Sequence, residues 1–173
     1  MKGIIAATIL LSALSTVMAQ NLPQAGAVAP AVNLPSNDGR QVSLNDYKGK
    51  WVVLYFYPKD FTSGCTLEAQ TFQRDLAKYQ NASAIILGVS VDNAESHKNF
   101  CAKEGLNFKL LADTDAKVSE AYGSVKDYDG KKMSARNTFI INPEGKIARV
   151  FTGVKPQTHS EEVLQALAEL KKS

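Results

Sequence analysis

One cysteine of this chain lies where its sulfur could do redox chemistry. The stretch Pro58 to Cys65, PKDFTSGC, follows an apolar run at 51–57 and opens a helix-like segment that continues to Tyr79. It places Cys65 in the first turn of the expected helix, where unpaired backbone N–H groups and the positive end of the helix dipole favour a thiolate. Because the thiolate is the nucleophile, we expect Cys65 to be reactive.

Two neighbours of Cys65 could handle a small polar substrate. Thr62 is the expected N-cap, with its hydroxyl beside both the sulfur and the unpaired N–H groups. Gly64 has no side chain, so a substrate oxygen could approach the N–H groups of Gly64 and Cys65. The positions that continue the face of Cys65 along the helix are Ala69, Phe72, Leu76 and Tyr79. This apolar stripe predicts that the sulfur faces a pocket in the protein.

The elements that must hold this stretch follow a βαβα order. The runs 51–57 and 84–91 are continuously apolar, as expected of strands buried on both faces. A second helix is expected at 94–104, capped by Asp92 or Asn93 and closed by Gly105. This order implies parallel strands with a right-handed crossover, and a site beyond the carboxyl end of the first strand.

The remaining segments complete an α/β fold. A turn at 37–40 separates the short strands 32–34 and 41–44 and indicates an N-terminal edge hairpin. A short strand (108–111) and a short helix (116–122) precede an insertion. The segments 137–141 and 147–151 predict an antiparallel hairpin, and an amphipathic helix at 159–171 closes the chain. The order is that of a thioredoxin-like fold.

Composition indicates one soluble globular domain after an N-terminal signal. The chain has 173 residues, 45% hydrophobic and 21% charged, and enough length to bury a core without disulfides. Residues 1–19 resemble a secretory signal peptide, with Lys2, an apolar region at 4–17 and a small-residue cleavage site ending at Ala19. The expected mature domain is 20–173, in the periplasm or secreted. The alternative is a membrane anchor, which the short, Ser-interrupted apolar run disfavours.

The charge of the chain does not suggest nucleic acid or stable membrane association. The formal net charge is +3, and loss of Lys2 with the signal leaves +2 (3 − 1).

The Pro, Thr and Cys spacing resembles the peroxidatic motif of peroxiredoxins. Within that family, FTSGCTLEA at 61–69 is similar to the Q class, the bacterioferritin-comigratory type, and RNTFII at 136–141 agrees with it. The resemblance extends from about Ala27 to the C-terminus. Ser63 stands where many relatives have proline, and any good first helical residue fits there.

The resemblance implies a role for each motif residue. Cys65 would attack the peroxide O–O bond and become a sulfenic acid, while Thr62 positions the peroxide. Arg136 would stabilise the thiolate and the charge that develops on the leaving oxygen. Pro58 would shield the sulfenate. The family also implies a thioredoxin-type fold with a peroxiredoxin-type insertion, a thioredoxin-like dithiol reductant, a monomer, and no cofactor or metal.

The resolving thiol is assigned by the same resemblance. One branch of the Q class carries it five residues after the peroxidatic cysteine, where this chain has Gln70. Another branch carries it in the following helix, and Cys101 fits that pattern, 36 positions after Cys65 (101 − 65). The alternatives for Cys101 are a small buried hydrophobe beside Phe100, or a metal pair with His97 one helical turn earlier.

Less specific interpretations stand beside these. Cys65 could be a buried structural cysteine or half of an inert disulfide, Arg136 a surface ion-pair residue, and Thr62 a plain helix cap. Two other functions share the fold: a periplasmic thiol–disulfide oxidoreductase, and a non-enzymatic thioredoxin-like binding module. The oxidoreductases use Cys-x-x-Cys, whereas this chain has Thr62 at the first of those positions.

Overall fold

A five-stranded mixed sheet forms the centre of the protein. The computed structural model describes residues 22–172, so the expected signal segment lies outside the described residues. The strand order is β5-β4-β3-β8-β9. The strands are β3 (Trp51–Phe56), β4 (Ala84–Ser90), β5 (Lys109–Ala112), β8 (Asn137–Ile141) and β9 (Ile147–Thr152). β3, β4 and β5 are parallel, while β8 pairs antiparallel with both β3 and β9.

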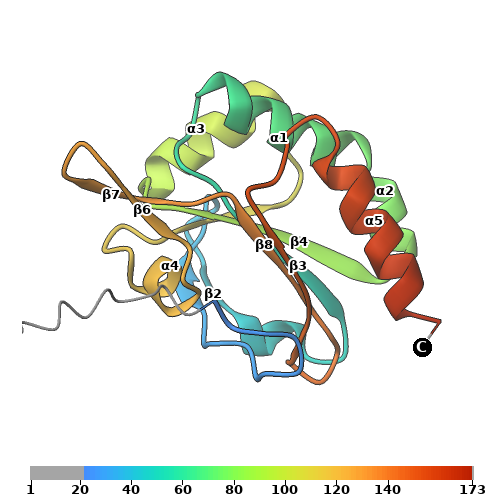
Figure 1. The fold of residues 1–173 in the computed structure, drawn as a ribbon. Helices are drawn as coiled ribbons and strands as arrows, with labels where there is room; N and C mark the ends of the chain where they lie inside the picture. The colour runs from blue at the N-terminus through green and yellow to red at the C-terminus, as the bar shows by residue number, and fades with distance from the viewer. Residues whose placement is uncertain (1–21, 173) are drawn as a thin grey trace, which may run out of the picture.

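Helices cover both faces of this sheet (Figure 1). One face carries α1 (Ser63–Arg74), α2 (Leu76–Asn81), α3 (Ala94–Glu104) and α5 (His159–Leu170). The other carries α4 (Lys117–Ala121) and the short 3₁₀ helix η1 (Leu44–Tyr47). Side chains of β3 alternate between the two cores, with Val53 and Tyr55 in the first and Val52 and Leu54 in the second. The arrangement confirms the predicted thioredoxin-like α/β fold.

The N-terminal hairpin is present but does not extend the main sheet. β1 (Asn33–Pro35) and β2 (Gln41–Ser43) form their own two-stranded sheet. The hairpin turn instead covers the free edge of β5, because Ser36 bridges to Leu111 and the Asn37 side chain accepts from the Leu110 N–H at 3.0 Å. The predicted N-terminal hairpin is therefore present at the edge of the sheet, and its turn is the part that protects β5.

The insertion before β8 contains a second hairpin that the sequence interpretation missed. β6 (Val125–Tyr128) and β7 (Lys131–Ser134) pair antiparallel around Asp129 and Gly130. Both turn residues have positive φ, 53° and 78°. The dipeptide Asp-Gly is a strong hairpin signal, so these strands were predictable from the turn.

The single helix expected up to Tyr79 is two helices. α1 ends at Arg74 and α2 begins at Leu76, with Asp75 between them at φ −96° and ψ 5°. The Asp75 carboxylate accepts from Arg74, Lys78 and Ser160, and its side chain is 2% exposed. A buried carboxylate with three such partners fixes the backbone locally, so the helix axis breaks at Asp75 while Tyr79 remains buried.

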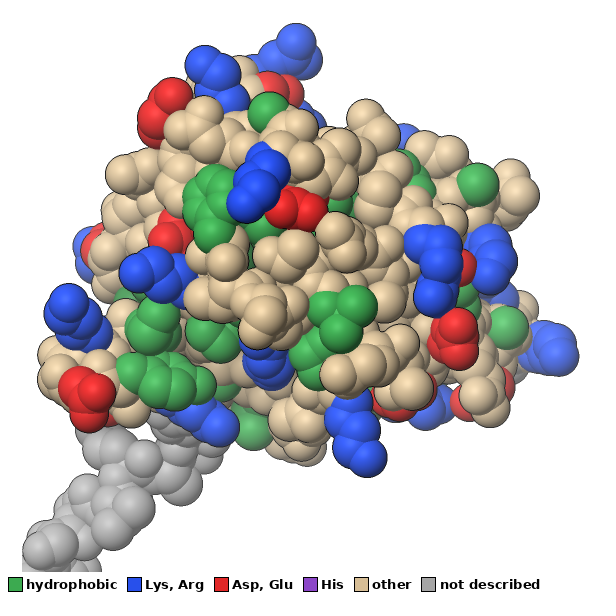
Figure 2. All heavy atoms as spheres, turned by 90° about the horizontal axis from the view of Figure 1, so that it is seen from above, with side chains coloured by type: hydrophobic (Ala, Val, Ile, Leu, Met, Phe, Trp, Pro, Cys, Tyr) green, Lys and Arg blue, Asp and Glu red, His purple; other side chains and the backbone are tan. Residues whose placement is uncertain are grey.

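The face seen from above carries dispersed charge. Figure 2 shows Lys and Arg side chains standing among Asp and Glu side chains and small, separate hydrophobic patches. Within residues 22–172, no helix has the length and apolar character to cross a membrane.

Candidate active site

Cys65 is the third residue of α1 and faces the core beneath that helix. The residue is 1% exposed and belongs to the core cluster that contains Tyr55 and Phe72. Nη2 of Arg136 donates to its Sγ at 3.2 Å. The sulfur is therefore held between the first turn of a helix and a guanidinium, two features that both favour negative charge.

Thr62 occupies the N-cap position but makes a different hydrogen bond from the one expected. Its backbone is extended, with φ −81° and ψ 147°, and no side-chain cap bond is present. Its Oγ1 donates instead to the carbonyl of Lys59 at 3.0 Å. The expectation that the hydroxyl caps the first-turn N–H groups is corrected: Oγ1 accepts no hydrogen bond from them and donates to the loop carbonyl.

Arg136 is anchored by a buried carboxylate that the sequence interpretation did not single out. Its Nη1 donates to Oε2 of Glu68 at 2.6 Å, and Glu68 is fully buried. The other oxygen of Glu68, Oε1, is 2.7 Å from Nδ1 of His159, which is also fully buried. Since the Arg136 side chain is only 23% exposed and contacts Cys65 as well, it is not a surface ion-pair residue.

The close approach of Arg136 leaves little space for a side chain at Gly64. A Cβ at this position would lie 2.8 Å from Nη2 of Arg136, the nitrogen that contacts the sulfur, and 3.9 Å from Cγ of Pro156. Any side chain at residue 64 would therefore press on the guanidinium.

A second buried network joins the loop before α1 to α3. Oδ1 of Asp60 accepts from the Tyr57 hydroxyl at 2.7 Å, and Oδ2 accepts from Ser96 at 2.7 Å. Oδ2 also lies 2.9 Å from Nδ1 of His97. Burial raises the pKa of Tyr57 well above its ordinary value, so its hydroxyl keeps the proton that it donates. Asp60 thus ties the active-site loop to the helix that carries Cys101.

The same network occupies the imidazole of His97. Besides its contact with Asp60, its Nε2 is 3.2 Å from the carbonyl of Leu111. Both ring nitrogens have partners, so the alternative of a metal pair with Cys101 has no free nitrogen to use. Among residues 22–172, no three His, Cys, Asp or Glu side chains are grouped to hold a metal ion.

Cys101 lies in α3 and shares one core cluster with Cys65. It is 7% exposed, and neither cysteine is in a disulfide. Burial, with a smaller contribution from Asp60, raises the pKa of the Cys101 thiol to about 12. The two sulfurs therefore have different electrostatic environments: Cys65 has a cationic neighbour, whereas Cys101 is a thiol in an apolar setting.

Phe61 covers the gap between the loop and α3. Its φ of 61° is unusual for a bulky residue, and its side chain is 46% exposed. Its ring packs edge-on against Phe100 with centroids 5.1 Å apart, and Nζ of Lys103 lies 5.5 Å above it. Pro58 is half-buried and follows directly after β3 and Tyr57.

The structure thus brings together Cys65, Gly64 and Arg136, and it adds Glu68, His159 and Asp60. Glu68 could have been found from the sequence, because it lies three residues after Cys65 and so neighbours it on one side of the helix. His159 gives no such signal, since its partner is 91 positions away.

Comparison with known proteins shows the family of this chain. The profile of the AhpC/TSA family matches residues 25–150. Peroxiredoxin Bcp of Bacillus subtilis is 41% identical over 149 residues, 84% of this chain and 95% of that protein. Peroxiredoxin Bcp of Escherichia coli K12 is 40% identical over 150 residues, 84% of this chain and 96% of that protein. The chain is a peroxiredoxin of the AhpC/TSA family.

Solved structures extend the match to three dimensions. Peroxiredoxin Q of Xanthomonas campestris superposes with a TM-score of 0.78 at 39% identity, covering 84% of this peroxiredoxin and 97% of that chain. BcpB of Mycobacterium tuberculosis gives 0.80 at 27% identity, covering 85% and 97%. The Q-class resemblance is confirmed, and the protein is a thiol peroxidase. The oxidoreductase and binding-module alternatives are not favoured.

Proposed function

We propose that this peroxiredoxin reduces hydrogen peroxide and organic hydroperoxides with Cys65 as the peroxidatic thiolate. The contact that carries the proposal is Arg136 Nη2 to Cys65 Sγ, 3.2 Å long. A fixed cation at the sulfur stabilises the thiolate before attack and can donate to oxygen during it. Gly64 leaves room for both groups. Thr62, exposed directly before the first residue of α1, would position the peroxide through its hydroxyl.

The first step consumes one peroxide and oxidises one sulfur. The Cys65 thiolate attacks the nearer peroxide oxygen, an S–O bond forms and the O–O bond breaks. The sulfur loses two electrons and becomes a sulfenic acid. The hydroxyl hydrogen of the peroxide stays on the sulfenic acid. The leaving alkoxide or hydroxide takes a proton from solvent water and departs as alcohol or water, and Arg136 offsets its developing charge. Pro58 shields the product from water and from a second peroxide.

In the second step Cys101 serves as the resolving thiol. Its sulfur attacks the Cys65 sulfenic acid, an S–S bond forms, and the hydroxyl leaves as water with the thiol proton. Two solved structures of Xanthomonas campestris peroxiredoxin Q each carry a cysteine-to-serine substitution, and the two positions are 36 residues apart in that chain. Cys65 and Cys101 have the same separation (101 − 65 = 36). A thioredoxin-like dithiol then reduces the disulfide.

The substrate range in the proposal includes organic hydroperoxides. Bacterioferritin comigratory protein of Xanthomonas campestris, solved in trapped intermediate and ligand complexes, is described by its alkyl peroxide reduction activity. That structure matches this chain with a TM-score of 0.78 at 38% identity. The half-exposed Phe61 beside Thr62 offers apolar surface for an alkyl group.

The proposal includes export and a monomeric mature domain. The charged, apolar and small-residue segments of 1–19 support a cleaved signal, after which 20–173 would form one domain in the periplasm or outside the cell.

The cheapest test of the function is peroxide consumption by the purified mature protein with thioredoxin and thioredoxin reductase. We expect repeated turnover with hydrogen peroxide and with cumene hydroperoxide, and none after Cys65→Ser. Turnover that persists in the Cys65→Ser variant would overturn the assignment of the peroxidatic residue.

A further inference from the structure

The buried imidazole ring of His159 has a hydrogen-bond partner at only one of its two nitrogens. The residue is fully buried at the start of α5, and its Nε2 has no hydrogen-bond partner in the described structure. The ring packs edge-on against Phe72 at 5.1 Å and Phe151 at 6.1 Å between centroids. An unsatisfied buried nitrogen is costly, so its presence calls for an explanation. The one polar contact of the ring is Nδ1 to Glu68 Oε1, at 2.7 Å.

That contact decides how Glu68 can bind Arg136. Arginine and a free carboxylate prefer two parallel N–H···O bonds, one to each carboxylate oxygen. Here Oε1 of Glu68 is occupied by His159, and Arg136 reaches only Oε2, through Nη1 at 2.6 Å. Nη2 is left free of the carboxylate and donates to the Cys65 sulfur at 3.2 Å.

We propose that His159 is a positioning residue that keeps the Glu68–Arg136 ion pair monodentate, so that Nη2 of Arg136 stays hydrogen-bonded to the Cys65 sulfur. The proposal rests on the function proposed for Cys65. Without the donor at Oε1, that oxygen would be buried and unpaired. Arg136 already binds the other oxygen through Nη1, so its Nη2 is a donor that could turn to Oε1 and make the pair bidentate. If Nη2 of Arg136 turned toward Glu68, it would lose its hydrogen bond to the Cys65 sulfur.

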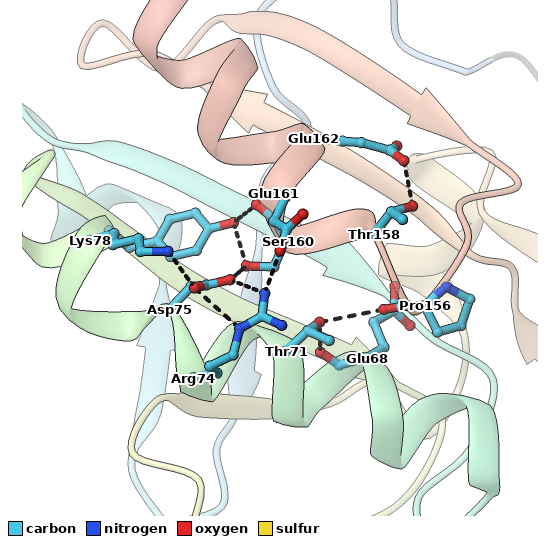
Figure 3. Close-up of polar contacts among 11 residues, drawn as sticks. Glu68, Thr71, Arg74, Asp75, Lys78, Pro156, Thr158, Ser160, Glu161 and Glu162 are labelled. Atoms are coloured by element: carbon cyan, nitrogen blue, oxygen red, sulfur yellow. Dashed lines mark hydrogen bonds and ion pairs between the residues drawn. The ribbon is translucent and has the colours of Figure 1, made fainter.

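The backbone of His159 is well placed for this role. Figure 3 shows the start of α5 against α1, with Asp75 bound to Arg74, Lys78 and Ser160. Ser160, the next residue after His159, also accepts at its carbonyl from the Tyr79 hydroxyl at 2.8 Å. On the other side, Thr71 contacts the carbonyl of Pro156 at 3.4 Å. Both flanks of His159 are therefore tied to the helices that carry Cys65 and its neighbours.

The ionisable groups around the contact come from several elements. Glu68 belongs to α1, Arg136 precedes β8, and Asp75 with Arg74 lies beyond Ser160 at the end of α1. On the sheet beneath, Tyr55 of β3 interacts electrostatically with Glu68, and burial raises the pKa of Tyr55 well above its ordinary value. Among residues 22–172, the side chain that hydrogen-bonds to Oε1 of Glu68 is His159.

The test compares two substitutions that separate packing from hydrogen bonding. His159→Phe keeps an aromatic ring between Phe72 and Phe151 but removes the donor. His159→Asn places an amide N–H₂ at the distance of Nδ1 from the backbone and restores the donor. Val163→Ala, at a fully buried position of the same helix, is the control for general loosening of α5.

The readout is the pH profile of Cys65 alkylation by iodoacetamide in a Cys101→Ser background, which needs no peroxide turnover. We expect His159→Phe to move the midpoint to higher pH by about one unit. The second-order rate constant for sulfenic acid formation should fall about tenfold. His159→Asn should stay close to the parent in both measurements, and Val163→Ala should not move the midpoint. An unmoved midpoint in His159→Phe, or an equal shift in Val163→Ala, overturns the proposal.

A second measurement keeps the proposal testable if His159→Phe does not fold. Nitrogen-15 NMR of the wild-type imidazole should show the proton on Nδ1 of His159, the nitrogen that faces Glu68. A ring protonated on Nε2 alone would have no donor for Glu68 and would overturn it. A protein without peroxidase activity but with the expected alkylation shifts would refute the function of Cys65 and leave the positioning by His159 intact.

Discussion

Arg136 and Cys65 are 71 positions apart, yet Nη2 of the arginine donates to the cysteine sulfur at 3.2 Å. The same guanidinium holds the buried Glu68 through Nη1. One side chain thus joins the first turn of α1 to the start of β8. The ionisation of the Cys65 thiol depends on which groups Nη1 and Nη2 of Arg136 bind.

The Arg136 contact predicts a shift in the ionisation of Cys65. We expect Arg136→Ala to move the midpoint of Cys65 alkylation to higher pH by about one unit, because the thiolate loses its fixed cation. The rate constant for peroxide reduction should fall about 100-fold. Arg136→Lys should recover only part of it, since an ammonium cannot serve Glu68 and the sulfur in the same geometry. Arg149→Ala, which breaks the more exposed pair with Glu169, is the matched control. Identical alkylation profiles for Arg136→Ala and wild type would contradict the assignment.

A side chain at position 64 should also weaken the contact between Arg136 and the Cys65 sulfur, by steric clash. In Gly64→Ala the new Cβ would meet Nη2 of Arg136 at 2.8 Å and push it from the sulfur. We expect a slower reaction with peroxide and an alkylation midpoint at higher pH, both smaller in size than for Arg136→Ala. Ser63→Ala, one position earlier and exposed, should leave both unchanged. Steady-state peroxidase assays and alkylation profiles check this, and a fully active Gly64→Ala protein would speak against the close packing.

Cys101 predicts that disulfide formation waits for local opening. Burial raises the pKa of its thiol to about 12, so the thiol stays protonated at neutral pH while α3 is closed over it. Opening of α1 or α3 would expose the thiol to water and let it ionise. We expect Cys101→Ser to consume one equivalent of peroxide, fail to cycle with a dithiol reductant and accumulate sulfinic acid at Cys65. Peptide mass spectrometry decides it: normal cycling of Cys101→Ser, or no Cys65–Cys101 linkage in oxidised wild type, would indicate a one-cysteine mechanism.

Asp75 predicts a pH dependence of stability. The hydrogen bond from Arg74, with those from Lys78 and Ser160, holds the pKa of Asp75 well below its usual range. The native state therefore binds fewer protons, and the stabilisation is complete above the ordinary aspartate value of about 4 and is lost as the pH falls below it. Asp75→Asn should lower the free energy of unfolding by about 2 kcal/mol at pH 7, and the difference should narrow between about pH 4 and 2.

Urea titrations at several pH values measure this difference. Glu95→Gln, which removes an exposed carboxylate 3.9 Å from Lys98, should cost under about 0.5 kcal/mol at any of them. If the difference in the free energy of unfolding between wild type and Asp75→Asn does not change with pH, the charge of the carboxylate contributes nothing to stability.

The N-terminal segment predicts cleavage on export. Expressed with its own first 19 residues in a Gram-negative host, the protein should be recovered from the periplasm beginning at Gln20. Intact-mass measurement tests this, and a cytoplasmic protein that keeps residues 1–19 would exclude it.

Most elements were predictable because their signals are local. The βαβα order, the α3 boundaries with Asn93 and Gly105, and the β8–β9 hairpin follow from apolar runs and cap residues. The break at Asp75 was not, since the carboxylate is held by Ser160, 85 positions away. At the site, the motif located Cys65, Thr62 and Gly64, and only a family resemblance pointed to Arg136. Contacts between distant segments, such as Glu68 with His159, leave no trace in spacing.

The buried carboxylate of Asp60 has a further consequence for how the protein moves. It binds Tyr57 in the segment after β3 and both Ser96 and His97 in α3, so the two cysteine-bearing regions share one anchor. Breaking that anchor would release both regions at once, as a single cooperative unit of sub-global unfolding. Hydrogen–deuterium exchange of the backbone amides in the first turn of α1 and around Cys101 should then report the same free energy of opening. The rate at which that unit opens would limit the redox cycle.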